Sequence, residues 1–120
     1  MGQFRFEDLR IWQESIELSD TLFDIADLAG NKKFYRFSEQ LRGAALSISN
    51  NIAEGSGSFS DKDFANYLSI ARKSLFECAN MLIIFQRRKI ITEETKVGLF
   101  IKLVRLSSQI TNFRKTILNK

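Results

Sequence analysis

The chain has 120 residues, 44% hydrophobic and 27% charged, a size and balance typical of one packed domain covering residues 1–120. It contains no His, no Pro and one Cys, which excludes an internal disulfide and multi-cysteine metal sites and removes the usual general base of enzymes. The N-terminus is charged where a signal peptide is apolar, and the longest purely apolar stretch is Met81–Phe85. We therefore expect a cytoplasmic, non-enzymatic protein with no membrane span, no metal and no cofactor.

Two helices are expected in the first half of the chain. The first covers residues 8–29, because the acidic pair Glu7 and Asp8 suits the positive end of a helix dipole and Gly30-Asn31 is a typical helix stop. The second covers residues 35–54 and ends at the sequence GSG that follows.

Two more helices are expected in the second half. The third begins after Ser60, which with Asp63 resembles a capping box, and runs to about residue 88. The fourth opens at Thr92, before two glutamates, and continues to about Leu118.

Apolar residues recur at alternating spacings of four and three along the last three expected helices, as in the core-facing seam of a helix bundle. The seams are Phe37, Leu41, Ala44, Ile48 and Ile52; then Phe64, Leu68, Ala71, Leu75, Cys78, Leu82 and Phe85; then Leu99, Leu103, Leu106, Ile110, Phe113 and Ile117. Short connections between long helices favour antiparallel neighbours, so the predicted fold is an all-α, antiparallel up-down four-helix bundle. Cys78 lies in a seam and is expected to be a buried apolar residue, not a reactive thiol.

The chain has more apolar surface than one bundle needs. The first helix has two apolar stripes: one consists of Leu9, Trp12, Ile16 and Phe23, and the other of Ile11, Leu18, Leu22 and Ile25. The fourth helix also has apolar residues outside its seam. Ile70, Met81 and Ile84 also fall off the seam of the third helix. We expect the second faces to contact other subunits, the candidates being Ile11, Leu18, Leu22, Ile25, Val97, Phe100, Ile101 and Val104. The alternative is an irregular bundle that buries these residues itself.

Polar residues flank the seams of the second and third helices and are expected to be partly buried. They are Gln40, Ser47, Asn51 and Glu54 on the second helix and Asp63, Ser74 and Glu77 on the third. A network between the two helices would fix their register, and a ligand site is the alternative. A further possibility is that Glu54 and Glu77 pair with Arg42 or Arg72 at a subunit boundary.

The charge differs between the halves of the chain. Residues 1–60 hold 6 Lys/Arg and 9 Asp/Glu, a net charge of −3, whereas residues 61–120 hold 12 and 5, a net charge of +7. This asymmetry fits a nucleic-acid partner, but it would equally attract the two halves of an antiparallel bundle to each other, and cations at 87–89 also suit a helix C-terminus. The candidate phosphate contacts are Arg72, Lys73, Arg87, Arg88, Lys89, Lys102, Arg105, Arg114 and Lys115.

The segments FEDLRIWQESIEL and QLRGAALSISNNIAEGSGSFSDKDFANYLSIARKSLFE resemble the four-helix bundle proteins encoded in intervening sequences of bacterial 23S rRNA genes. The bundle is also similar to the accessory protein of diversity-generating retroelements, a basic, ring-shaped pentamer implicated in nucleic-acid binding. The chain departs from the family in lacking proline and in having Gly43 where a second basic residue is usual. The resemblance implies a bacterial, homo-oligomeric bundle, a pentamer.

Two functions follow from these observations. The first is a homo-oligomer that binds RNA or DNA non-specifically through basic surface contributed by several subunits. The alternative is an oligomeric scaffold or adaptor that binds another protein.

Overall fold

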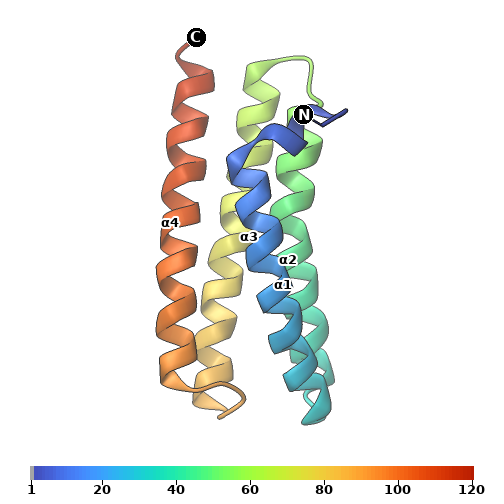
Figure 1. Cartoon of the computed structure of the whole chain (residues 1–120), viewed down its shortest axis with the longest axis vertical. Helices are drawn as coiled ribbons and strands as arrows, with labels where there is room; N and C mark the ends of the chain where they lie inside the picture. Colours follow the sequence, from blue (N-terminus) through green and yellow to red (C-terminus); the bar gives the residue numbers. More distant parts are fainter. Residues whose placement is uncertain (1) are drawn as a thin grey trace.

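The computed structural model describes residues 2–120, which form four long α-helices and one short 3-10 helix. The α-helices are α1 (Arg10–Asn31), α2 (Tyr35–Ser56), α3 (Asp61–Arg87) and α4 (Glu93–Leu118), and the 3-10 helix η1 (Arg5–Asp8) precedes α1. The helices alternate in direction and build an elongated body of 46 × 24 × 23 Å (Figure 1). The predicted all-α, up-down four-helix bundle is therefore confirmed.

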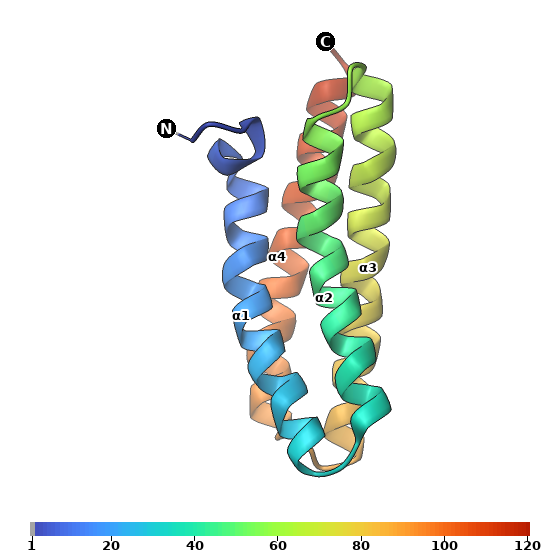
Figure 2. The same ribbon diagram turned by 90° about the vertical axis from the view of Figure 1, so that its right-hand side faces the viewer.

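Both of the tight turns, α1–α2 and α3–α4, lie at one end of the bundle, which we call the turn end (Figure 2). The α2–α3 loop and both chain termini lie at the opposite end. Segments near residues 33 and 89, far apart in the sequence, are consequently neighbours in space.

The helix N-termini in the second half of the chain form as predicted. The Ser60 hydroxyl accepts a hydrogen bond from the Asp63 N–H, and the Thr92 hydroxyl accepts one from the Thr95 N–H, each at 3.1 Å. These bonds satisfy backbone donors that have no partner within the helix.

The predicted end of the first helix is wrong. Gly30 and Asn31 continue α1 as helix, and the chain reverses instead at Lys33, whose φ is 69°. Asp8, predicted to open α1, belongs to η1, and α1 begins at Arg10. The turn closes with a hydrogen bond from the Phe34 N–H to the Ala29 carbonyl at 2.9 Å, which satisfies an acceptor in the last turn of α1.

The closest packing joins α2 and α3. A Cβ added at Gly55 would lie 2.6 Å from the Cβ of Tyr67, so only glycine allows this approach. Of the predicted seams, all residues are buried except Phe37 and Phe113, which are half-buried against the core. Cys78 is buried as expected, and Met81, predicted to lie off the core, is buried too.

The structure corrects the predicted faces of α1. Ile11, Leu18, Leu22 and Ile25, expected to contact another subunit, all belong to the core of their own chain. They share this face with small residues, Ser15, Ser19, Ala26 and Ala29, which let neighbouring helices come close. The other stripe of α1 is half-buried beside it, with Trp12 packed edge-on against Phe6 at 4.9 Å between ring centroids.

None of the helices in residues 2–120 combines the length and the apolarity that crossing a bilayer requires.

Candidate nucleic-acid interface

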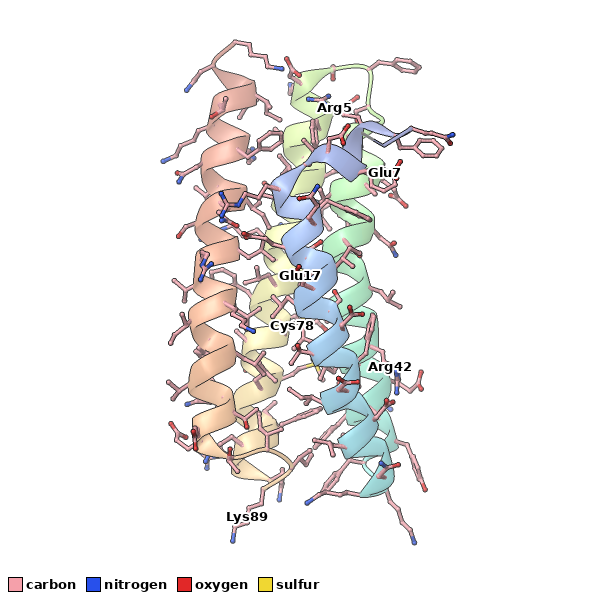
Figure 3. The ribbon with its side chains drawn as sticks, in the orientation of Figure 1. Arg5, Glu7, Glu17, Arg42, Cys78 and Lys89 are labelled. Atoms are coloured by element: carbon pink, nitrogen blue, oxygen red, sulfur yellow. The ribbon has the colours of Figure 1, made fainter. Side chains whose placement is uncertain are left out.

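Six exposed cations gather at the turn end of the bundle. They come from the α1–α2 turn (residues 32–36) and from the end of α3 (residues 87–89), which are distant in the sequence. Neither segment contains an acidic residue. We call this group the basic end; it consists of Lys32, Lys33, Arg36, Arg87, Arg88 and Lys89. The Lys32 ammonium donates a hydrogen bond to the Lys89 carbonyl at 3.3 Å and so links the two turns. Figure 3 shows Lys89 projecting from this end, away from the helices.

The two turns have the same backbone geometry. Lys33 and Lys89 both adopt left-handed conformations, with φ of 69° and 61°. In each turn the next residue donates its N–H five residues back, Phe34 to Ala29 at 2.9 Å and Ile90 to Phe85 at 2.8 Å. Each turn therefore has a buried or half-buried apolar residue directly after an exposed lysine.

Lysine is an unusual residue for these positions. A left-handed backbone brings Cβ close to the following carbonyl oxygen and costs a residue other than glycine about 1–2 kcal/mol. Helix ends with this hydrogen-bond pattern usually carry glycine at this point. The charged side chain is thus retained at both turns at some cost in stability.

The nine cations predicted to contact phosphates do not form one surface on the monomer. The structure groups only Arg87, Arg88 and Lys89 with the α1–α2 turn, at the basic end. The prediction missed Lys32, Lys33 and Arg36, which join them there. The other six lie along the sides of α3 and α4.

Lys102 and Arg105 face acidic residues. They line a hollow of about 150 Å³ between α1 and α4 together with Glu14 and Glu17. Opposite charges on the two walls support the reading in which charge asymmetry attracts the halves of the bundle to each other. These two cations are consequently weak candidates for phosphate contacts.

Arg72, Arg114 and Lys115 line a separate hollow of about 220 Å³ between α3 and α4. The Arg114 guanidinium donates to the Ala65 carbonyl at 3.0 Å, and that of Arg72 lies over the Phe76 ring, 4.6 Å from its centroid. Both arginines thus already have partners within the chain. Lys73 is exposed on α3.

Part of the predicted polar network connects α2 to α3. The hydroxyls of Ser47 and Ser74 are 2.7 Å apart, and the Asn51 amide donates to the Ser47 hydroxyl at 2.9 Å and to its carbonyl at 2.7 Å. These bonds use polar groups that the helix contact partly buries, as a register-fixing network would.

The rest of that prediction is wrong. Gln40, Glu54, Asp63 and Glu77 are exposed and not partly buried. Arg42 pairs with Asp27 on α1 of the same chain. A pair of Glu54 or Glu77 with Arg42 or Arg72 at a subunit boundary stays a prediction.

The outer side of α4 carries an exposed apolar stripe. Val97, Ile101 and Val104 are 48%, 63% and 63% exposed, and they lie on the side of α4 opposite its buried seam. Phe100 is half-buried and, with Phe76 of α3 and Val104, lines a groove of about 290 Å³ between the two helices. The three residues of this stripe and Phe100 are four of the eight predicted subunit contacts.

The site offers few groups for catalysis. Within residues 2–120, no three Asp, Glu or Cys side chains converge as metal ligands would. Burial, and to a smaller degree the charge of Glu77, raises the pKa of the Cys78 thiol from its ordinary 9.0 to about 12. A thiol with this pKa is protonated at neutral pH and is a poor nucleophile.

Comparison with known proteins agrees with the resemblance found in the sequence. A family model described as 23S rRNA-intervening sequence protein matches residues 7–112. A crystal structure from Bacteroides thetaiotaomicron, of a protein described as having unknown function and belonging to the S23 ribosomal protein family, superposes with a TM-score of 0.82. That chain is 24% identical, and the match covers 88% of this chain and 98% of the other, which supports the fold alone. Neither description names an enzymatic activity, and no curated protein matches the chain.

Proposed function

Since the chain belongs to the 23S rRNA-intervening sequence protein family, we propose that it is a non-enzymatic homo-oligomer that binds RNA or DNA through its basic end without reading sequence. The observation that carries this proposal is the pair of left-handed lysines, Lys33 and Lys89, at the tips of neighbouring turns. Strained backbone that persists in two places at one end of a molecule is a reason to look for function there.

The charge of the basic end supports phosphate binding. Six exposed cations lie together at the basic end, and Glu93 lines the adjoining hollow with Lys32 and Lys89, so the local charge is more positive than the net charge of +4 of the whole chain suggests. Lysine and arginine contacts to phosphates release counterions, so such binding depends on salt and not on base sequence.

Assembly would strengthen this binding. The exposed stripe of Val97, Ile101 and Val104 is a surface that a neighbouring subunit could bury. In a ring, here proposed to be a pentamer, rotation about one axis relates all subunits, so every basic end would face the same rim. Several such ends on one rim would bind a polyanion more tightly than any one of them.

The proposed setting is the bacterial cytoplasm. The chain has a single cysteine, which is buried, and so needs no oxidising compartment to form disulfides.

The double variant Lys33→Gly/Lys89→Gly tests the role of the basic end. Glycine relieves the left-handed strain, so we expect the free energy of unfolding to stay level or rise by about 1 kcal/mol per site. Binding of a labelled duplex at low salt should nevertheless weaken, and the slope of log K against log salt should become shallower by about 2, because two phosphate contacts are lost. Fluorescence anisotropy measures the binding, and urea titration measures the stability.

The matched control is Lys73→Gln/Lys115→Gln, which removes the same charge from the sides of α3 and α4. Equal losses of affinity in both variants would show that net charge matters and that the basic end does not. Absence of any binding by the unmodified protein at low salt would exclude the proposed function altogether.

A scaffold or adaptor role is the second candidate, and the groove between Phe76, Phe100 and Val104 favours it. If this groove stays free in the oligomer, an amphipathic helix of another protein could occupy it. Purification with one protein partner and no nucleic acid, lost on Val104→Gln, would support this alternative.

A further inference from the structure

A hollow of about 570 Å³ lies beside the basic end, between the C-terminal part of α1 and the α3–α4 turn. Its volume falls in the range of about 300–1,000 Å³ that is common for small-ligand sites, but the hollow is shallow and open and would cover only part of a ligand. The half-exposed Leu28 and the largely buried Ile90 and Ile91 supply its apolar lining, and Lys32 and Lys89 line it as well. Apolar walls beside two cations suit a ligand that is flat and apolar on one part and anionic on another.

We propose that this hollow binds an unpaired nucleotide of a single strand, with the base against the apolar walls and its phosphate at Lys32 and Lys89. The inference rests on the proposed nucleic-acid function and deepens it, because it names single-stranded RNA or DNA as the preferred ligand. Proteins that bind single strands combine cations that follow the backbone with aromatic side chains that stack on the bases. The hollow has no aromatic side chain in its lining, so aliphatic side chains would take that place here.

The polar groups of the hollow fit this ligand. The Lys32 ammonium uses one of its three donors on the Lys89 carbonyl at 3.3 Å, and the others are available to a phosphate. Gln86 contributes an amide that can donate to and accept from a base edge. Glu93 also lines the hollow, and its carboxylate is held 3.3 Å from the Lys96 ammonium, which offsets its repulsion of a phosphate.

A duplex cannot use this hollow in the same way. Its bases are paired and stacked inside, so a duplex offers the basic end only phosphates and sugars unless a base is turned out at additional cost. The apolar walls therefore add affinity for a single strand and none for a duplex, while the cations attract both.

Leu28→Gln isolates the contribution of the apolar walls. It keeps the charge and nearly the size of the side chain, and Leu28 is already 46% exposed, so the fold should tolerate the change. We expect affinity for a short oligothymidylate to fall about tenfold, the loss of roughly one base contact, while affinity for the same strand annealed to its complement is unchanged.

Leu46→Gln on α2 is the matched control, because Leu46 is 47% exposed and does not line the hollow. It should leave both affinities as they are. The inference is overturned, with the proposed function intact, if the duplex binds as tightly as the single strand or if the two leucine variants behave alike. Failure of both nucleic acids to bind would instead remove the proposed function.

A third measurement separates a strand from a free nucleotide, which carries the same chemical groups. Uridine monophosphate alone should compete only weakly, because it lacks the neighbouring phosphates that the other cations of the basic end would contact. Competition by the monophosphate at the same concentration as the oligonucleotide would make the hollow a small-molecule site and overturn the single-strand assignment.

Discussion

The helices α1 and α4 have the same excess of apolar residues in the sequence, and the structure treats them in opposite ways. In α1 one stripe forms core and the other is half-buried beside it. In α4 the second stripe, Val97, Ile101 and Val104, remains exposed. Apolar excess alone therefore does not locate an interface, because the surroundings of a helix decide how much of its circumference the chain can cover.

The surroundings differ for identifiable reasons. The chain entering α1 folds over it, with Phe6 against Trp12 and the Gln13 amide donating to the Glu7 carbonyl at 2.8 Å. Small residues on α1 also let α2 come close, so that the Ser19 hydroxyl is within 3.5 Å of the Ala45 carbonyl. The outer side of α4 has only the groove beside Phe76 of α3. The exposed stripe is thus an apolar surface that no other part of the chain covers.

The largest expected effect comes from truncating one apolar side chain on α1 and one on α4 and comparing the loss in the free energy of unfolding. Leu22→Ala on α1 removes a fully buried side chain and should lower the free energy of unfolding by about 2–5 kcal/mol. Val104→Ala on α4 should change it by about 0.5 kcal/mol or less in the monomer, because the side chain is mostly in solvent. Urea denaturation at low protein concentration measures both. Similar losses would mean that the outer side of α4 is covered even in the monomer.

The double variant Ile101→Gln/Val104→Gln tests the exposed stripe as a subunit contact. Burying each side chain in an interface would stabilise the oligomer by about 1–2 kcal/mol, so the double change should raise the dissociation constant by about a hundredfold. Sedimentation velocity should show a shift to smaller species with unchanged helicity. Leu46→Gln/Ile70→Gln alters two comparably exposed apolar residues on α2 and α3 and should leave the mass unchanged. A monomeric unmodified protein would exclude the assembly itself.

The seams and caps could be predicted because each depends on residues close together in the sequence. Alternating spacings of four and three place Leu41, Leu75 and Leu103 in the core, and Ser60 bonds to the N–H three residues on. The phase of α1 could not be predicted in this way. Both of its stripes are apolar, and the small residues that let α2 come close to α1 have little weight in an apolar pattern.

The basic end could be predicted only in part, because it depends on topology. Arg87, Arg88 and Lys89 were identified, whereas Lys32, Lys33 and Arg36 are 50 or so positions away and join them only when α1 and α3 end at the same side. A signal was present: an up-down bundle brings its first and third turns together, so their charges should be considered jointly. The left-handed conformation of Lys33 could not be predicted, because Gly30-Asn31 indicated an earlier helix end.

The pH dependence of the free energy of unfolding tests whether water reaches the Cys78 thiol in the core between α3 and α4. Unfolding returns the Cys78 thiol to a pKa near its ordinary 9.0, while burial holds the pKa of the folded state at about 12. The unfolded chain therefore loses this proton first as pH rises, and stability, complete below pH 9, should fall between pH 9 and 12 by about 1.4 kcal/mol per pH unit. Comparison with Cys78→Ala isolates the contribution of the thiol, because every other group is common to the two proteins. Equal slopes in both proteins would show that water reaches the thiol.

The smallest expected effect concerns Gly98, which lies on α4 next to Val97 of the exposed stripe. A Cβ added there meets no atom within 4 Å, so Gly98→Ala should raise the free energy of unfolding of the monomer by about 0.5–1 kcal/mol through helix propensity alone. Gly43→Ala on α2 has equally open surroundings and should give the same gain. A gain for both in the monomer, combined with weaker assembly for Gly98→Ala only, would place a neighbouring subunit directly over the N-terminal half of α4. Equal assembly of the two variants would restrict the contact to the side of α4 that carries Ile101 and Val104, since a subunit that also covered Gly98 would sense the added methyl group.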